Sequence, residues 1–395
     1  MMDDGLELRV LHGVSDDLRR AVAQCGHPHE SVALGWFSIS SPSRALIVRR
    51  VVPLPVGAPT PSGVRAEFSH RSLVQAMGDA AAAGCGVCIL HQHVGSGPPA
   101  LSATDLRSFT ELGSALATLF PSAPLASIVV SQDWHAAGLA RLPGGRMVRV
   151  CRARWLGGCI EIRPAPLPLT RERGARHDVL WGAGGEGRLR AVRVGVLGAG
   201  GGGSHVLQQL AHAGVGCEVA VDPDCLDESN RSRVVGTRPR DVGKLKLIAM
   251  RRIAAEAGDD VKFVEVAERF PSRASLEQLA KCDVLVSCVD TLHVRRDVMA
   301  FAWQHAIPLV DIGLSIDPRN PPPGAAAIGG QVFIGVPGAA CMWCAGILSE
   351  QRLRDERDPE GYVRGGGGAQ VVSLNGVLAS QAVGAPLQLD VERVA

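Results

Sequence analysis

The sequence predicts an α/β protein of two domains, the first built on a mixed sheet and the second on a mostly parallel sheet. A chain of 395 residues is longer than one hydrophobic core usually serves. Three prolines at alternate positions from Pro164 to Pro168 favour an extended linker. We therefore expect domains at residues 1–163 and 173–395, joined by a linker at 164–172. In the second domain strand-like and helix-like stretches alternate, which is typical of a parallel sheet with crossover helices.

The composition indicates a globular protein of a reducing compartment. Hydrophobic residues make up 46% of the chain and charged residues 20%. With 41 basic and 39 acidic residues, the net charge of +2 provides no cationic field to hold nucleic acid or an anionic membrane. The 11 cysteines are scattered and the N-terminus carries no secretion signal. The uncharged runs at 321–349 and 365–389 hold too many glycine, proline or polar residues for a spanning helix. We expect a cytoplasmic protein without nucleic-acid or membrane partners.

Apolar runs and helix-start signals predict six strands and two helices in the first domain. Strands are expected at residues 6–14, 31–38, 45–52, 88–90, 126–131 and 147–152. Helices are expected from Ser15 or Asp16 to Gln24 and over 104–117, the second with Ser102 as its N-cap. Strands and helices mixed in this way favour a mixed sheet with flanking helices.

In the second domain, five strand-like runs alternate with four helical stretches. The strands are expected at residues 192–197, 217–221, 262–266, 284–289 and 308–312. The helices are expected at 205–213, 242–257, 275–280 and 291–305. The charged segment 352–364 leads into a run of glycines and is predicted to be a mobile surface loop.

A group of metal-binding residue types follows an apolar run in the first domain. His91 and His93 are two residues apart, so their imidazoles point to the same side of an extended strand end. Ser102 and Asp105 add a hydroxyl and a carboxylate one helical turn apart. Two imidazoles and one carboxylate make a zinc site with one open position, which suits hydrolysis. Glu30, further upstream, is the expected base.

This set of residues resembles the JAMM (MPN) metalloprotease motif, in which a Glu precedes a His-x-His, a Ser and an Asp. The resemblance covers about residues 5–155 and implies a JAMM/MPN-like α/β fold. It also implies that the substrate is a peptide or isopeptide bond after a ubiquitin-like tail. The implied roles are zinc ligation by His91, His93 and Asp105, general acid/base action by Glu30, and oxyanion support by Ser102.

A glycine-rich turn separates a predicted strand from a predicted helix in the second domain. Its glycines include Gly198, Gly200, Gly201 and Gly203. Asp222 lies 19 residues past the last of these and ends the next predicted strand. Glycines let the backbone approach a phosphate at a helix N-terminus, and the acidic residue can hold ribose hydroxyls. The pattern predicts a Rossmann-like nucleotide site, for which a nicotinamide dehydrogenase is the first candidate.

The polar residues that follow the turn favour adenylation over hydride transfer. Asn230 and Arg233 lie 8 and 11 residues past Asp222, Lys246 lies 13 further on, and Asp290 ends a later strand. Arg and Lys neutralise a triphosphate, Asp binds Mg²⁺, and Asn orients an oxygen. Together these groups suit attack by a carboxylate on the α-phosphate of ATP with loss of pyrophosphate.

From about Arg173 onward, the chain resembles the ThiF/MoeB family, the bacterial relatives of ubiquitin-activating enzymes. The resemblance rests on Asp222, Asn230, Arg233, the run Val242–Lys246, and Asp290 with Arg295. It implies that Asp222 holds the ribose, that Asn230, Arg233 and Lys246 act on the phosphates, and that Asp290 binds Mg²⁺. It further implies that Arg176 reaches the ATP of a partner subunit, and hence a homodimer.

Cys341 and Cys344 occupy the place of the first zinc pair of that family. No cysteine or histidine follows them in the sequence, so a four-thiolate zinc site cannot form from this pair and a downstream pair. Either thiol could be a nucleophile that forms a thioester, and a buried structural role is an equal alternative.

Taken together, the motifs predict a bifunctional enzyme of a bacterial ubiquitin-like system. Its first domain would trim or remove a ubiquitin-like protein, and its second would adenylate the C-terminal glycine of that protein. Two alternatives stay open. One is a related enzyme that activates a small-molecule, peptide or RNA carboxylate or serves sulfur transfer. The other is a binding scaffold without turnover.

Overall fold

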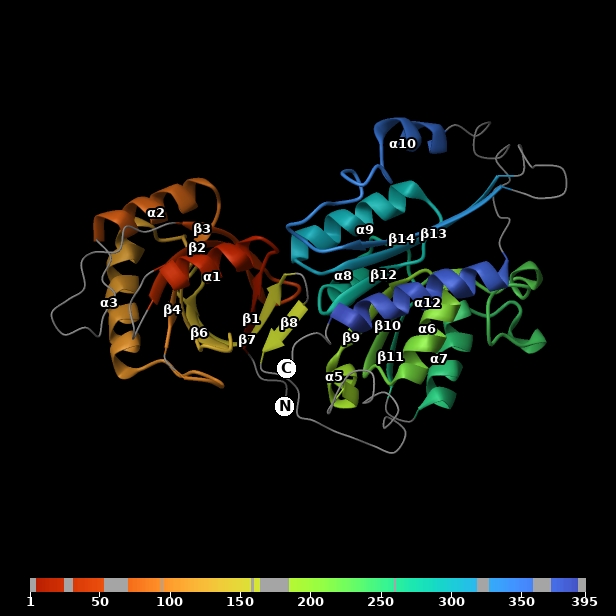
Figure 1. Cartoon of the computed structure of the whole chain (residues 1–395), viewed down its shortest axis with the longest axis horizontal. Coiled ribbons are helices and arrows are strands. Elements are labelled where there is room, and N and C mark those ends of the chain that lie inside the picture. The colour runs from red at the N-terminus through yellow and green to blue at the C-terminus, as the bar shows by residue number, and fades with distance from the viewer. Residues whose placement is uncertain are drawn as a thin grey trace. The chain divides into compact units, whose positions relative to one another are not determined.

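A computed structural model gives the fold of the chain. It describes residues 5–24, 31–52, 70–93, 95–157, 160–163, 185–258, 261–317, 327–357 and 371–389. The chain divides into two compact units, Met1–Ala165 and Pro166–Ala395, whose elements are labelled in Figure 1. Both units combine helices with β-sheet, which confirms the α/β class.

The first unit is built on one eight-stranded sheet. Its strands are β1 (Leu6–Val10), β2 (Ser31–Ser40), β3 (Ala45–Val52), β4 (Gly86–Gln92), β5 (Leu125–Val130), β6 (Ala136–Arg141), β7 (Met147–Leu156) and β8 (Ile160–Arg163). The strand order is β1-β3-β2-β4-β5-β6-β7-β8, and β1 also pairs with β7. The sheet is mixed: β1 is parallel to β3 and β7, and β4 is parallel to β5, whereas the remaining pairs are antiparallel. Because β1 has a partner on each side, the sheet curls back on itself.

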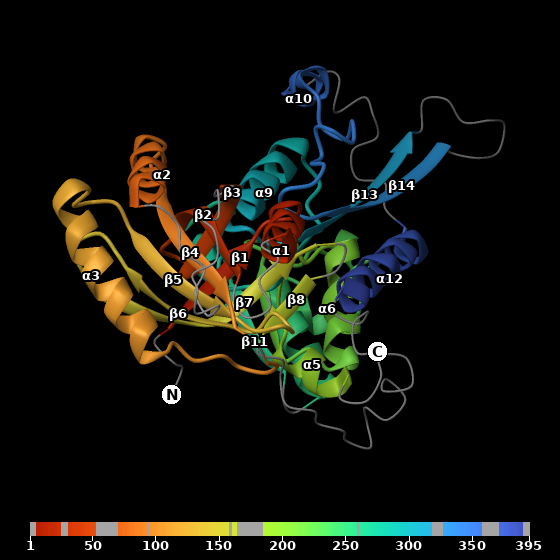
Figure 2. The ribbon, with the colours of Figure 1, turned by 60° about the vertical axis from the view of Figure 1, so that its left-hand side comes forward.

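Among the described residues of this unit, three helices cover the sheet: α1 (Val14–Gln24), α2 (His70–Ala82) and α3 (Ala103–Leu119). α1 packs Leu18 into a core shared with Trp155 of β7. α2 and α3 pack Met77 and Phe109 into a second core, and Figure 2 shows the two helices together at one side of the sheet. Helix α2 and strands β6 and β8 lie where the sequence analysis predicted no element.

The second unit has a six-stranded sheet of order β11-β10-β9-β12-β13-β14. Its strands are β9 (Arg193–Leu197), β10 (Cys217–Val221), β11 (Lys262–Val266), β12 (Val284–Ser287), β13 (Leu309–Asp317) and β14 (Ala327–Gly335). The first five strands are parallel, whereas β13 and β14 form an antiparallel pair. Strands from β9 to β13 are joined through helices, as crossover connections require.

Helices lie on both faces of this second sheet (Figure 1). They are α5 (Gly185–Ala191), α6 (Gly201–Ala213), α7 (Lys246–Ala257), α8 (Arg273–Leu279), α9 (Leu292–His305), α10 (Glu350–Arg357) and α12 (Val372–Leu389), with short 3-10 helices η2 (Glu228–Asn230) and η3 (Pro239–Asp241). Leu279 of α8 and Phe301 of α9 join Val219 of β10 in the main core. On the other face α6 and α7 pack through small residues such as Ala211 and Ala254.

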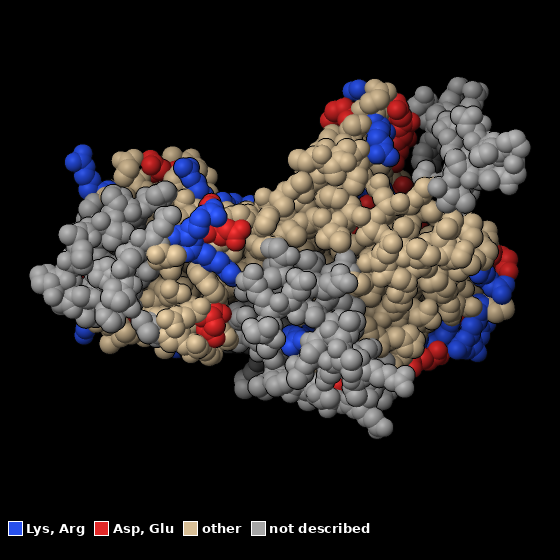
Figure 3. Space-filling view, in the orientation of Figure 1, with Lys and Arg blue, Asp and Glu red and all other residues tan. Residues whose placement is uncertain are grey.

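The prediction of a surface loop over 352–364 is wrong for its first part, because residues up to Arg357 belong to helix α10. Ser349 Oγ accepts a hydrogen bond of 3.2 Å from the amide of Arg352 at the start of this helix, and Leu353 is buried. These contacts outweigh the charged composition, and Figure 3 shows acidic and basic side chains together on α10 at the top of the view. Residues 358–364 lie outside the described residues. No helix within the described ranges is both long and apolar enough to span a membrane.

Candidate functional site

In the second unit, the glycine turn lies at the carboxyl edge of the parallel strands. Strands β9, β10 and β12 end at one level, because Leu197 is aligned with both Val221 and Ser287. Three segments that follow these strands therefore meet at this edge: the glycine turn, Asp222, and the segment that ends at Asp290. Ligands of open α/β sheets bind at this edge.

Close backbone contacts explain the glycines of the turn. Gly198 has a φ of +88°, in the left-handed region that glycine adopts without strain. A Cβ atom on Gly203 would lie 1.7 Å from the carbonyl oxygen of Gly198, so no larger residue fits there. Gly200 is the N-cap of α6 and Gly201 its first residue. The first helical turn therefore presents backbone amides without bulky side chains, as phosphate binding requires.

Asp222 holds the glycine turn in place and contacts Lys246. Its Oδ2 accepts a hydrogen bond of 2.7 Å from the amide of Ala199, and its Oδ1 accepts one of 2.8 Å from the amide of Asp224. The Lys246 Nζ lies 3.7 Å from Asp222 Oδ1 and donates a hydrogen bond of 2.9 Å to Asp224 Oδ2. Both Asp222 and Lys246 are buried. An ammonium group is therefore fixed beside the turn by two carboxylates.

Asn230 and Arg233 belong to one loop, which is fastened to the start of α6. Asn230 Oδ1 accepts a hydrogen bond of 3.3 Å from the amide of Asp227. Arg233 Nη1 donates a hydrogen bond of 2.9 Å to the carbonyl of Ser229. Two residues beyond Arg233, an amide of the loop donates to Ser204 Oγ at 3.1 Å. Since Ser204 lies in the first turn of α6, this bond brings the loop to the glycine turn.

Asp290 is exposed at the end of the segment after β12. Arg295, from α9, is hydrogen-bonded to this segment. The buried guanidinium of Arg295 donates hydrogen bonds to the carbonyls of Val289 and Ile312, at 3.3 and 2.7 Å. Its Nε also lies 3.6 Å from Asp311 Oδ1. Burial raises the pKa of Asp311 to about 6, although Arg295 opposes this shift.

Helix α10 reaches back to the start of α9, two residues past Asp290. The two carboxylate oxygens of Glu356 accept hydrogen bonds from the amides of Leu292 and His293, at 2.7 and 3.0 Å. These amides have no partner within their own helix, so the carboxylate caps α9 and favours its positive end. A segment 64 residues further along the chain therefore fixes the helix that follows Asp290.

The structure brings some of the predicted residues together and leaves others apart. Asp222 and Lys246 are in direct contact. Within the described ranges, no hydrogen bond or ion pair joins Asp290 to Arg233 or to Lys246. Arg176 lies outside the described residues. The sequence analysis missed Asp224, whose position two residues after Asp222 was the available signal.

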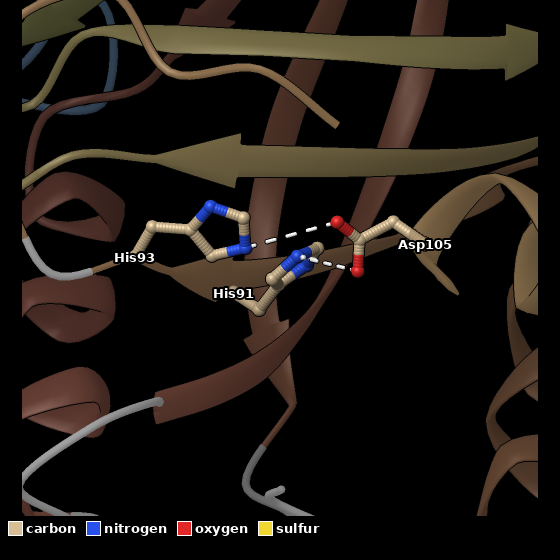
Figure 4. Close-up of side chains that lie close together, drawn as sticks. All are labelled: His91, His93 and Asp105. Atoms are coloured by element: carbon tan, nitrogen blue, oxygen red, sulfur yellow. Dashed lines mark ion pairs between the residues drawn. The ribbon is translucent and has the colours of Figure 1, made fainter. Parts of the chain in front are cut away.

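The first unit gathers the predicted metal ligands (Figure 4). His91 lies in β4, His93 follows that strand, and Asp105 lies in the first turn of α3. The two Nε2 atoms lie 3.3 and 3.7 Å from the two carboxylate oxygens of Asp105. One ligand atom of each residue lies within 4.8 Å of the others, and no other such group occurs in the part of the chain that the structure describes.

Ser102 fixes Asp105 by a reciprocal pair of hydrogen bonds at the start of α3. Ser102 Oγ accepts from the amide of Asp105 at 3.1 Å, and Asp105 Oδ2 accepts from the amide of Ser102 at 2.7 Å. The sequence prediction of Ser102 as the N-cap is confirmed. Burial opposes ionisation of Asp105, but these bonds and the nearby imidazoles leave its pKa below the usual value. The carboxylate is thus held charged and oriented.

The donor set fits a zinc ion. His91 is 8% exposed, and its buried Nε2 faces only the Asp105 carboxylate, at 3.3 Å and without good hydrogen-bond geometry, so the lone pair of the neutral imidazole can serve a metal ion. Burial also lowers the pKa of the His91 imidazole, with a smaller opposing effect from Asp105, and so favours the neutral form that binds metals. Glu30, the predicted base, lies outside the described residues.

Cys341 and Cys344 lie on a turn between β14 and α10. Their Sγ atoms are 3.7 Å apart. Cys344 is exposed and Cys341 is half-buried. The sequence left open a buried structural role for these cysteines, and the exposure of Cys344 excludes that role for this residue.

Comparison with known proteins relates the second unit to adenylating enzymes. The model of the ThiF family matches residues 175–389. The chain is 36% identical over 144 residues to the SAMP-activating enzyme E1 of Haloferax volcanii, an alignment that covers 35% of this chain and 52% of that protein. It is 24% identical over 164 residues to the sulfur carrier protein ThiS adenylyltransferase of Escherichia coli K12, which covers 40% and 61% respectively. This chain spans between about half and three-fifths of the length of these two relatives.

A solved structure of Escherichia coli MccB with ATP also matches, with a TM-score of 0.43, 23% sequence identity, and coverage of 56% of this chain and 64% of that one. The family match carries the assignment, because it takes in more than half of the 395 residues. The chain belongs to the ThiF family.

Proposed function

We propose that the second unit is an ATP-dependent adenylyltransferase that activates the C-terminal glycine of a ubiquitin-like protein. One observation carries this proposal: the glycine turn, the Asp222–Lys246 pair and the segment to Asp290 follow neighbouring strands that end at one level. The relatives support it, since one is named for activating SAMP and another for adenylating the sulfur carrier ThiS.

In the proposed reaction, a carboxylate oxygen of the tail attacks the α-phosphorus of ATP. A bond from this oxygen to phosphorus forms, the bond to the bridging oxygen breaks, and pyrophosphate leaves. The amides of the glycine turn and the cations of Arg233 and Lys246 stabilise the phosphate charge. Asp222 keeps a second lone pair on each oxygen, which can accept a ribose hydroxyl. Mg²⁺, held by Asp290, would supply further positive charge when bound, and Asn230 would orient a phosphate oxygen.

The test is exchange of radiolabelled pyrophosphate into ATP. The probes are a ubiquitin-like protein that ends in Gly-Gly, the same protein without its last two residues, and a peptide of its last seven residues. We expect exchange with the intact protein, and loss of exchange with the truncated one. Asp290→Ala should abolish exchange, whereas Asp297→Ala, which removes only a surface ion pair of α9, should not. Full exchange by Asp290→Ala would refute the assignment, and exchange with the peptide alone would favour a peptide-activating enzyme.

We also propose that Arg176 acts on the ATP of a partner subunit in a homodimer. Mixing the inactive Arg176→Ala and Asp290→Ala variants then restores exchange, because every dimer that contains one subunit of each variant has one site with neither substitution. If the mixture stays as inactive as its components, Arg176 acts within its own subunit or not at all. Sedimentation of the unmixed protein gives the subunit number independently.

For the first unit we propose a JAMM-type zinc (iso)peptidase that trims or removes a ubiquitin-like protein. The observation behind it is the convergence of His91, His93 and Asp105, in which both imidazole Nε2 atoms face the Asp105 carboxylate. These residues would hold zinc, which would act as a Lewis acid towards the scissile carbonyl and make water a better nucleophile. Glu30 would move the proton, and Ser102 would support the oxyanion.

Zinc content and cleavage of a tail extended beyond Gly-Gly test this second activity. We expect about one zinc ion per chain, lost in His91→Ala. Glu30→Gln should keep the zinc and lose cleavage, while Glu111→Gln, an exposed glutamate of α3, should keep both. Equal cleavage by Glu30→Gln and the parent protein would remove Glu30 as the base. Because both activities act on one tail, tethering them raises the local concentration of the trimmed product.

A further inference from the structure

The thiols of Cys341 and Cys344 lie on a turn that is anchored to the core of the second unit. The carbonyls of Cys341 and Met342 accept hydrogen bonds from the amides of Ala345 and Ile347, both at 2.9 Å. Between the two cysteines, Met342 is fully buried and packs in the main core. The anchored turn holds the two thiols side by side, three residues apart and 3.7 Å from sulfur to sulfur.

Backbone amides act on one of these thiols. Partial burial of Cys341 disfavours its thiolate, but the amides of Cys344 and Trp343 stabilise it, and the pKa of Cys341 falls below the ordinary value. The neighbouring Cys344 is exposed. The buried Cys282 of the same unit differs sharply, because burial raises its pKa to about 12. The turn therefore pairs one activated thiol with one accessible thiol, an arrangement that supports thiol–disulfide exchange.

A four-ligand zinc site, which the ThiF/MoeB resemblance implies here, does not fit the residues present. No cysteine or histidine follows Cys344 in the sequence. In the ranges that the structure describes, the one group of three or more potential metal ligands is that of His91, His93 and Asp105, in the other unit. A structural zinc ion requires four protein ligands. The pair retained here has half that number.

We propose that Cys341 and Cys344 are a redox-active dithiol. Low-molecular-weight disulfides oxidise it reversibly to a disulfide between the two cysteines. The Cys341 thiolate attacks one sulfur of the small disulfide, which forms a mixed disulfide and releases one small thiol. Cys344 then attacks the Cys341 sulfur, which closes the protein disulfide and releases a second small thiol. The two protein thiols lose two protons and two electrons, and the small disulfide gains them. Closure requires the sulfurs to approach by about 1.6 Å.

The test exposes the full-length protein to glutathione buffers of increasing disulfide content, followed by acid quenching, alkylation and tryptic digestion. One tryptic peptide, residues 320–352, contains Cys341 and Cys344 and no other cysteine. In the parent protein, we expect this peptide to be two hydrogens lighter than the reduced peptide, because the two cysteines are joined. It should carry neither alkyl groups nor glutathione. In Cys344→Ser it should instead carry one glutathione on Cys341. The internal control is the exposed Cys225, which should form only mixed disulfides.

Two results would overturn the proposal. The first is a parent peptide that stays doubly alkylated, or carries glutathione as Cys225 does, when glutathione disulfide is in excess. The second is a zinc ion, in addition to that expected in the first unit, that is present in the parent protein but absent from both Cys341→Ser and Cys344→Ser. Such an ion would make the pair metal ligands. None of these measurements depends on adenylation, so their outcome is separate from that of the proposed function. Thermal unfolding of both variants confirms that they fold.

Discussion

Lys246 Nζ lies 3.7 Å from Asp222 Oδ1, although the two residues are 24 positions apart and belong to different elements. Asp222 also fastens the glycine turn through the amide of Ala199. The acidic residue therefore links the phosphate-binding turn to a buried ammonium group. Asp224 is the second anchor of this group, with a hydrogen bond of 2.9 Å.

Lys246→Met should lower pyrophosphate exchange by about 100-fold or more, because it removes a fixed cation beside the phosphates. The methionine keeps the length of the side chain and removes its charge. Lys244→Met is the matched control, since Lys244 is exposed two residues earlier in the same segment. Steady-state exchange at saturating ATP is the measurement. Equal losses in the two variants would show that general charge, and not the position of Lys246, matters.

Glu356→Gln should loosen the start of α9, because a neutral amide replaces the carboxylate that caps Leu292 and His293. A cap of this kind contributes about 1 kcal/mol. Hydrogen exchange at these two amides should therefore speed up by about fivefold, with a smaller fall in pyrophosphate exchange. The control is Glu350→Gln, at the exposed start of α10. Unchanged protection of the two amides in Glu356→Gln would contradict a capping role.

Glu218→Met should stabilise the second unit at neutral pH. Glu218 is fully buried in β10, and neither carboxylate oxygen has a hydrogen-bond partner among the described residues. Burial raises its pKa well above 4.5, so the folded protein retains a proton that the unfolded chain releases. Its contribution to stability therefore falls as the pH rises above about 4.5.

Calorimetry of the full chain between pH 5 and 8 measures this effect. We expect the free energy of unfolding to rise by about 1–3 kcal/mol in Glu218→Met at pH 8, and by less at pH 5. The exposed Glu268 gives the control variant Glu268→Met, which should change neither value. A destabilised Glu218→Met with an unchanged pH dependence would mean that the carboxyl has a partner in solution.

Glu7→Gln should destabilise the first unit, with the opposite dependence on pH. Glu7 is buried, which by itself would raise its pKa, but Arg154, Arg9 and Arg152 lower it to about 2. The carboxylate therefore contributes stability above about pH 4.5, and this contribution is lost as the pH falls towards 2. The shift corresponds to about 3 kcal/mol at neutral pH. Acid unfolding of the parent and Glu7→Gln proteins should converge near pH 2, and parallel curves would refute this prediction.

Local sequence patterns predicted most strands and helices close to their observed limits. The errors occur where tertiary contacts outweigh composition. Residues 136–141 (β6) contain three alanines and a glycine and have little strand preference of their own. They form a strand because β5 and β7 pair with them on either side. Likewise, α6 begins at Gly201 rather than at the predicted residue 205.

The chemical groups of both candidate sites could be read from the amino-acid sequence. A glycine turn between strand and helix, an acidic residue one strand later, and two imidazoles beside a capped helix follow from short-range spacing, which the backbone geometry of each element fixes. Which charged groups contact one another became known only from the fold. The contact of Lys246 with Asp222 and Asp224, and the cap of α9 by Glu356, depend on chain segments brought together by burial of the core. Spacing along the chain carries no information on such contacts, because packing between elements sets them.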